Sequence, residues 1–513
     1  MTLAVRPGFA QSGGAELVMT DRAAARFLDQ ATWGPTPATI IQLQQMGINN
    51  WLEWQFSLNT SDLPDQPALN AAGMTNGNLQ PVQRAFFQNT VTGQDQLRQR
   101  IAFVLSQIWV VSAESGVPDA YAYPPYWRIF RDNAFGNYRD IIKAVTLSPA
   151  MGRYLNMANN NKGNAAKGTA ANENYARELL QLFTLGLNQL NPDGSYVLDS
   201  NHNPVPTYDQ AEITSQAKLL TGWTYPTAPG ATAKTNNPAY YIGQMFAVEA
   251  EHDTTAKTIF GNINVPAGQT AEQDLESLLD GLMQQNTMAP FISQQLIEHL
   301  VTSNPSPAYI SRVSNVFLNN GSGVRGDMQA VITAILTDPE ARAADEQTTV
   351  TANFGHLREP VLFMANLLRG LNATLSATSA IYNDTTEMSQ DLFYAPSVFS
   401  YFSPQSRTEK GLLGPEFQIY STQTAADRGD LINSAIYGTL DGGTKVNLAP
   451  FTQNGSTTEA LLDYVSYVFL HHSMSSVLQQ QATDAVNAQT TAAAKTQAAL
   501  YVVLTSGEYQ IVQ

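Results

Sequence analysis

Apolar residues recur at helical spacing over most of this chain, and this periodicity limits its fold more than any other feature. Within residues 94–111, five of them fall three or four positions apart: Leu97, Ile101, Val104, Leu105 and Ile108. That spacing gives a helix one apolar face, which packing against other helices can bury. The chain is therefore predicted to fold mainly as helices.

Turn and capping residues mark where such helices begin and end. Pro37 follows Thr36 at a first helical position and Gly47 follows Met46 at a helix end, so a helix is predicted over 38–46. The same reasoning predicts helices over 137–147, 149–156, 173–185, 208–221, 271–285, 290–302, 307–319, 325–337, 359–370, 424–437, 457–471 and 485–504.

Strand signals are few. Residues 244–248 and 257–263 are predicted to pair as one small β-hairpin, and no repeat of solenoid period is found. The fold class is thus mainly α, a large multi-helix domain with long loops. A chain of 513 residues exceeds one ordinary core, so two helical lobes are predicted, 20–270 and 271–513, with 345–355 as a second candidate boundary.

The charge balance excludes some partners. The net charge is −16 and no run of Lys or Arg offsets it, so the surface repels phosphate backbones and nucleic acid is not an expected partner. The chain has no cysteine, which excludes disulfides and thiolate metal sites. No apolar run reaches the ~18–20 residues of a membrane span. The first twenty residues lack a signal-peptide core, so either the protein is cytoplasmic or its signal has been removed.

The most distinctive helix follows an Asn- and Gly-rich segment at 157–172. Asn172 can cap its first turn, and Glu173 and Arg177 share one face and can pair, as can Asn174 and Glu178. A capped helix with an ion pair explains this pattern. The alternative places Glu173 and Glu178 in a site beneath the segment, as acid and base or as ligands of a divalent metal ion, with Asn172, Asn174 and Arg177 binding substrate.

The next helix, over 208–221, adds Asp209 and Glu212 on one face. Asp209 also suits a helix N-terminus, which is the simpler interpretation. If the two helices pack together, four carboxylates could converge around Arg177, because a cluster of like charges needs a cation or a proton.

One histidine stands out from the other five. His252 lies between Glu251 and Asp253, an arrangement suited to metal binding or proton transfer, although a loop histidine held by a neighbouring acid is commoner. The other histidines are interpreted as structural or solvated: His202, His299, His356, His471 and His472.

Aromatic residues with many Asn and Gln suit a carbohydrate groove. Trp51, Trp54, Trp109 and Trp127 are interpreted as core residues of helices. Trp223 and Tyr225, beside a Pro- and Thr-containing loop, are instead predicted to form an exposed platform for substrate. The nucleophile-elbow, zinc-protease, phosphate-loop and dinucleotide motifs are all missing.

These segments resemble a known family. The match consists of AARFLDQATWGPTP at 24–37, NENYARELLQLFTLG at 172–186, EITSQAKLLTGW at 212–223, EHDTTAKTIFG at 251–261, the stretch 291–342, LREPVLFMANLLRGL at 357–371 and LTSGEYQ at 504–510. In this order they are similar to the bacterial domain-of-unknown-function family numbered 1800. The resemblance implies an exported, periplasmic or secreted protein, often encoded beside a second exported family, with no established reaction.

Three functions follow as expectations. The first is an extracytoplasmic hydrolase acting on a polymer such as a polysaccharide, with Glu173, Glu178, Asp209, Glu212 and His252 as catalytic residues. The second is a metal-binding or redox accessory protein that uses Glu251, His252 and Asp253. The third is a non-catalytic export or surface-assembly partner of another exported protein.

Overall fold

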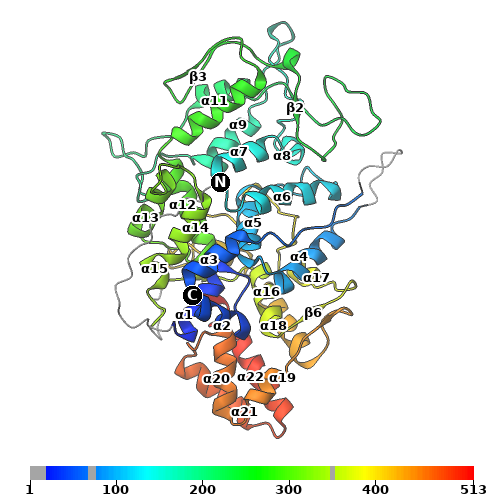
Figure 1. The fold of residues 1–513 in the computed structure, drawn as a ribbon, viewed down its shortest axis with the longest axis vertical. Helices are drawn as coiled ribbons and strands as arrows, with labels where there is room; N and C mark the ends of the chain where they lie inside the picture. The colour runs from blue at the N-terminus through cyan, green and yellow to red at the C-terminus, as the bar shows by residue number, and fades with distance from the viewer. Residues whose placement is uncertain (1–18, 68–76, 347–352) are drawn as a thin grey trace, which may run out of the picture.

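The computed structural model describes residues 19–67, 77–346 and 353–513. About half of it, 51%, is helical, and its strands form only short antiparallel pairs, so the predicted mainly α class is confirmed. The molecule is elongated, with α11 (Ala271–Gln284) near one end and the helices of residues 458–504 at the other (Figure 1). The prediction about a signal segment concerns residues outside the described ranges, apart from the last two of the first twenty.

The N-terminal helices begin at the residues that the capping rules favour. The side chain of Thr20 caps α1 (Asp21–Ala31), and Thr36 forms a capping box with Thr39 at α2 (Pro37–Met46). Gly47 ends α2 with a φ of 72°, in the left-handed region that glycine tolerates. The helices that follow are α3 (Ile48–Ser57), α4 (Gln80–Thr92), α5 (Gln96–Ile108), α6 (Tyr123–Asn133), α7 (Tyr138–Thr146) and α8 (Pro149–Tyr154).

The middle of the chain contains an unusual helix. The predicted helix over 173–185 begins as α9 (Asn174–Glu178) and continues as a π-helix, η3 (Leu179–Thr184). Such segments are rare and are found frequently at functional sites. It is followed by α10 (Gln210–Leu219), which packs against α9.

The predicted single hairpin is wrong in its pairing. Both predicted segments contain a strand, but β2 (Phe246–Ala247) pairs with β1 (Trp223–Thr224), and β3 (Lys257–Ile259) pairs with β4 (Ile263–Val265). Each strand is two or three residues long, so local turns and backbone contacts decide its partner more than any alternating pattern does.

The second half of the chain is again helical. Its elements are α11 (Ala271–Gln284), α12 (Met288–Leu300), α13 (Pro307–Leu318), α14 (Met328–Thr337), α15 (Pro339–Arg342), β5 (His356–Leu357), α16 (Pro360–Gly370), β6 (Thr374–Leu375), α17 (Tyr382–Glu387), α18 (Thr422–Tyr437), β7 (Thr444–Lys445), α19 (Ala449–Asn454), α20 (Thr458–Phe469), α21 (Ser476–Asn487), α22 (Ala492–Leu504) and β8 (Ile511–Val512). The helix predicted over 485–504 is wrong in extent, because a turn at 488–491 separates α21 from α22 and Thr491 caps the latter. No helix among the described residues is long and apolar enough to cross a bilayer.

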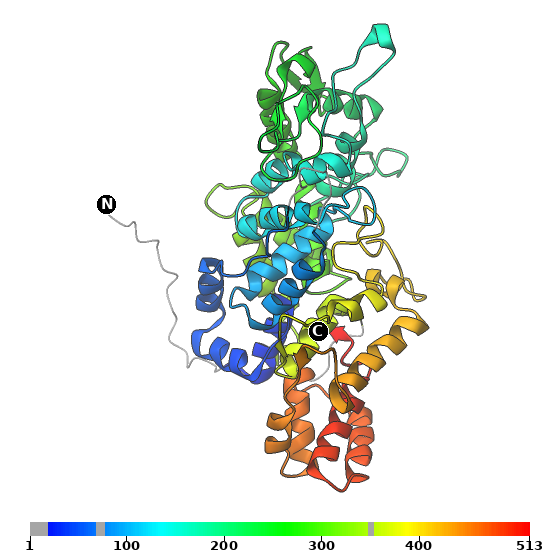
Figure 2. The same ribbon diagram turned by 90° about the vertical axis from the view of Figure 1, so that its right-hand side faces the viewer.

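One continuous cluster of buried apolar side chains extends from Ala24 to Tyr509. The predicted boundary near residue 270 lies between β4 and α11, and buried residues of this cluster stand on both sides of it. The second boundary, at 345–355, lies partly outside the described residues. Near the middle of the molecule β8 pairs with β5, which brings the C-terminal residues close to α1 and α16 (Figures 1 and 2).

A buried ionic cluster joins these central elements. Asp29 of α1 accepts hydrogen bonds from Arg358 and from Asn366, and Nε2 of His471 lies 3.1 Å from its Oδ2. Arg358 and the ring of His471 hold the pKa of Asp29 at about 2, although burial opposes this. Asp29 is thus held as an anion in the interior.

Candidate functional site

The residues predicted from sequence lie close together in the fold, but they belong to separate contact networks. Glu173 is engaged by three partners: Arg177 at 3.2 Å, and Gln210 and Thr214 of α10 at 2.7 and 2.8 Å. The predicted ion pair and the packing of the two helices are therefore confirmed. The same contacts fill both oxygens of the carboxylate with hydrogen-bond donors.

The predicted caps are also confirmed. Asn172 Oδ1 accepts the N–H of Asn174 at 2.9 Å, and Asp209 Oδ1 accepts that of Glu212 at 2.8 Å. Asp209 is exposed at the start of α10. These side chains satisfy the free N–H groups of a helix terminus, which is the simpler of the two interpretations.

Glu212 faces a different neighbour. Its Oε1 accepts from Gln216 at 2.7 Å and its Oε2 accepts the N–H of Phe260, in the turn between β3 and β4, at 2.6 Å. Burial raises its pKa. The carboxylate thus joins α10 to the small β3–β4 ribbon, and its contacts include neither Glu173 nor Glu178.

Glu178 is the predicted carboxylate that lies at the junction of α9 and η3. Burial raises its pKa, against the effect of neighbouring Arg177, and its charge acts on Tyr154 and Tyr208. It is half-buried, so it keeps access to solvent while it favours a proton. Of the predicted acids on these two helices, Glu178 has the environment that best suits proton transfer.

His252 is fully buried and bonded at both ring nitrogens. Nδ1 lies 3.0 Å from the carbonyl oxygen of Thr221, and Nε2 lies 3.1 Å from Oδ2 of Asp274, which also accepts from Lys257 at 2.6 Å. Gly222, at a φ of +87°, passes so close that an added Cβ would lie 3.0 Å from that of His252. His252 therefore fixes the LTGW turn to α11.

The predicted metal ligands Glu251, His252 and Asp253 do not form a ligand set. Across the described residues, no three His, Asp or Glu side chains are placed to hold one ion. Asp253 accepts from Thr255, and both nitrogens of His252 already have protein partners. His252 and Asp253 thus bond to other groups of the protein, and these bonds do not direct them toward a common metal position.

The predicted exposed platform is wrong. Trp223 is 2% exposed and Tyr225 is 7% exposed, and both belong to the core. Tyr225 packs edge-on against Tyr241 at 6.3 Å between ring centroids. These rings are buried in the core instead of presented to a substrate, because their large apolar surface is more stable away from water.

Sequence reasoning missed a second group of titratable side chains, at the C-terminal end of α12. We call it the acid cluster and define it as Glu298 and His299 of α12, His356 of β5, Glu416 of η5 (Pro415–Ile419) and Arg100 of α5. Nδ1 of His356 lies 3.2 Å from Oε1 of Glu416, and Arg100 donates to the carbonyl oxygen of His299 at 2.8 Å. Four elements distant in sequence thus meet here.

The two carboxylates of the acid cluster differ in environment. Glu298 is partly exposed and accepts from Gln294 at 2.7 Å, and burial by the surrounding protein together with the charge of Glu416 raises its pKa to about 8. Glu416 is 5% exposed and contacts His356. Burial, aided by Arg100 and His356, lowers the pKa of His299 to about 3, so this ring is neutral at physiological pH.

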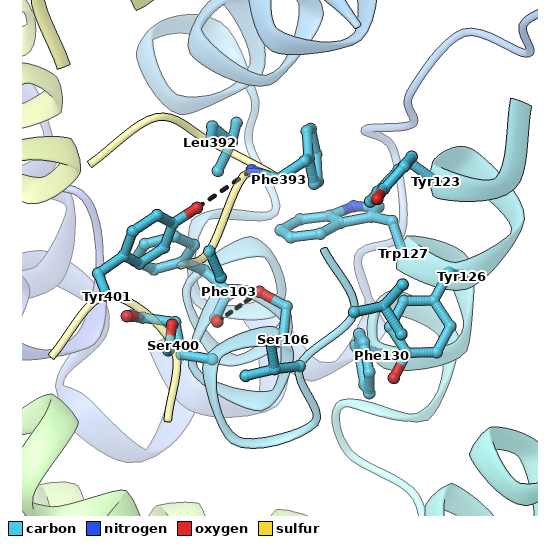
Figure 3. A pocket seen from close by; sticks show the side chains of 14 residues that line it. Phe103, Ser106, Tyr123, Tyr126, Trp127, Phe130, Leu392, Phe393, Ser400 and Tyr401 are labelled. Atoms are coloured by element: carbon cyan, nitrogen blue, oxygen red, sulfur yellow. Dashed lines mark hydrogen bonds between the residues drawn. The ribbon is translucent and has the colours of Figure 1, made fainter. Parts of the chain in front are cut away.

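Behind the acid cluster lies a further buried carboxylate. Glu359 accepts from Gln107 of α5 at 3.1 Å and from Gln390, and burial raises its pKa while Arg100 lowers it. Gln107 also lines a small cavity, several of whose other lining residues are shown in Figure 3. Arg100 and Gln107 lie seven residues apart on one face of α5, so this helix connects the cluster to the cavity.

The sequence contained partial signals for this cluster. Glu298 and His299 are adjacent acid and imidazole groups on a predicted helix, and His356 stands two residues before Arg358 and Glu359. Nothing in the sequence joins them to Glu416, which lies 60 residues beyond His356 in a segment without a predicted element.

A comparison with protein-family models gives one match. The model described as a protein of unknown function, DUF1800, covers residues 26–511. The chain belongs to this family. Neither the curated proteins nor the solved structures contain a match to it.

In this DUF1800 chain, two of the segments that resemble the family contribute to these regions. NENYAREL forms α9 with Glu173 and Glu178, and LREP connects β5 to α16 with Glu359 at the helix start. The family match extends over the acid cluster as well, since all five of its residues fall within 26–511.

Proposed function

We propose that the protein is a hydrolase that acts outside the cytoplasm on a polymer such as a polysaccharide, and that Glu298 and Glu416 are its acid and base. The observation on which this rests is the pair itself. Glu298 reaches solvent with a pKa of about 8, so it holds a proton at neutral pH, beside a buried carboxylate paired with a histidine. A carboxylic acid that keeps its proton at neutral pH near a second carboxylate is the arrangement that acid–base hydrolysis requires.

The proposed step uses both groups at once. The carboxylic acid of Glu298 donates its proton to the bridging oxygen as the bond from that oxygen to the sugar carbon breaks. The carboxylate of Glu416 takes a proton from a water molecule whose oxygen forms the new bond to this carbon. The products are two shorter chains, one of which ends in the hydroxyl that Glu298 protonated.

Exposed aromatic rings near Glu416 support a polymer as substrate. Phe417 is 43% exposed directly after Glu416, and Phe399 is 42% exposed on the same segment. Gln418 accepts the N–H of Ser403 at 2.7 Å, which holds the two ends of this segment together. Flat rings on the segment that holds Glu416 suit the apolar faces of sugar rings, the role that the sequence assigned to Trp223 and Tyr225.

The test is release of reducing ends from a panel of bacterial and plant polysaccharides by the purified protein. Glu298→Gln and Glu416→Gln are each expected to lower kcat at least 100-fold. Glu53→Gln, on an exposed face of α3, is the matched control and should keep full activity.

A further variant, Glu178→Gln, separates the two candidate sites. Loss of turnover in Glu178→Gln with retention in Glu298→Gln would move the site to α9. Absence of turnover on every polysaccharide of the panel would reject the proposed reaction.

A further inference from the structure

A small internal cavity lies between α5, α6 and the segment 389–402. Its volume is about 30 Å³, and half of the residues that line it are aromatic: Phe103, Tyr123, Tyr126, Trp127, Phe130, Phe393 and Tyr401. These rings come from all three elements and surround the space from several sides (Figure 3). In this arrangement both the faces and the edges of the rings are available for favourable packing against the ring of a ligand.

Several hydroxyl groups around the cavity are already engaged by the backbone. Tyr126 donates to the carbonyl oxygen of Trp109 and Tyr401 to that of Asp391, each at 2.8 Å, and Ser106 donates to Phe103 at 2.7 Å. Gln107 differs from them. Its Nε2 is turned to Glu359, and among the described residues its buried Oε1 has no donor. The lining therefore combines aromatic surface with one available acceptor.

The wall formed by 389–402 is strained. Three of its non-glycine residues adopt the left-handed region: Ser389 at φ 68°, Phe393 at 74° and Ser400 at 64°. Such conformations persist only where neighbouring contacts impose them, and they cluster at ligand clamps and switches. Here the hydroxyl of Tyr401 accepts the N–H of Phe393 at 3.1 Å within the wall, and the carbonyl oxygen of Phe393 accepts the N–H of Ala113, in the segment after α5, at 2.9 Å.

We propose that this cavity is a binding pocket for a small molecule with one aromatic ring and one hydrogen-bond donor, admitted by outward movement of the 389–402 wall. The ring packs among the aromatic side chains, and its donor bonds Oε1 of Gln107. The closed volume suffices for about one water molecule, so a ring enters only as the wall moves and releases its strained residues. This pocket is separate from the acid cluster, on the opposite side of Glu359.

Phenol is the probe for this proposal, with benzene and cyclohexanol as comparisons. Titration calorimetry on the full chain should show that phenol binds about 3- to 10-fold more tightly than benzene, the factor expected of one neutral hydrogen bond. Cyclohexanol, which has the donor without the flat ring, should bind more weakly than phenol. Equal affinities for phenol and benzene would overturn the role of Gln107.

Two variants fill the pocket from opposite sides. Ala395→Phe and Val111→Phe are each expected to abolish phenol binding, because both residues line the cavity. Ala493→Phe, at an exposed position of α22, is the control and should bind as the unsubstituted protein does. Circular dichroism verifies that each variant is folded. If one of the two filling variants does not fold, the other one still tests the proposal. Failure of phenol to bind the unsubstituted protein, or unchanged binding to a folded filling variant, would overturn the proposal.

Discussion

Glu298 is the residue whose protonation should be visible in stability. Its pKa is raised to about 8 in the folded protein, above the ordinary 4.5, so the folded state holds the proton more tightly than the unfolded state does. The resulting stabilisation is complete below pH 4.5 and is lost as the pH rises toward 8. We expect the Glu298→Gln variant, which cannot ionise, to lose less stability over this range, by about 2 kcal/mol after allowance for partial exposure.

Urea unfolding at pH 5 and at pH 8 measures this difference. Glu53→Gln, at an exposed position, should follow the unsubstituted protein at both values. A parallel decline in Glu298→Gln and the unsubstituted protein would show that Glu298 ionises normally.

Gly222 is the residue at which adding a single methyl group should lower the stability of the fold. A Cβ there would meet the backbone N and the Cβ of His252 at 3.0 Å, and its φ of +87° disfavours any side chain. Gly230 has a similar φ of +78° but nothing within 4 Å. We therefore expect Gly222→Ala to be less stable than Gly230→Ala by about 2 kcal/mol in urea unfolding, the typical cost of overpacking. Equal losses would mean that the loop shifts freely away from His252.

Interactions between residues close in sequence could be predicted, but contacts between residues far apart in the chain could not. The Asn172 and Asp209 caps and the pair of Glu173 with Arg177 depend on residues two to four positions apart. The pair of His356 and Glu416 depends on how β5 and η5 pack against α12, which no spacing shows. The burial of Trp223 likewise depends on tertiary contacts.

At the scale of elements, strongly capped helices were predictable and short strands were not. Thr36, Pro37 and Gly47 define α2 through backbone hydrogen bonds that they satisfy locally. The turn between α21 and α22 contains no Gly or Pro, so the sequence extends one helix through it. The change from the α-helix α9 to the π-helix η3 could not be predicted from the sequence either, because an α- and a π-helix have nearly the same apolar pattern over six residues.

The side chain of Arg358 adds to the backbone pairing of β5 with β8. Its guanidinium donates to the carbonyl oxygens of Tyr509 and Ile511 and to Asp29. We expect Arg358→Gln to lower the free energy of unfolding by about 3 kcal/mol, because it leaves a buried carboxylate and two carbonyls without this cation. Arg407→Gln, at an exposed position, should change it little. Similar effects of the two variants in thermal unfolding would contradict this role.

At the scale of the molecule, contacts between the two predicted lobes are extensive. Tyr138 donates its N–H to Gly326 at 2.8 Å, and Gln107 bonds Glu359 at 3.1 Å. We therefore expect residues 19–270 and 271–513, expressed separately, to lack fixed tertiary structure, since each would expose part of the shared core. Dispersed NMR spectra from either fragment alone would show instead that a lobe folds independently.

The burial of Asp29 beside Arg358, His471 and the strand at 511–512 has a consequence for biosynthesis. The anion is in the first helix, while its neighbours come from segments up to about 480 residues later. At ribosomal rates of about 5–20 residues per second, roughly half a minute to a minute and a half separates the appearance of α1 from that of β8. The groups that hold the charge of Asp29 are made only from residue 358 onward, and the centre of the protein closes only after β8 has left the ribosome.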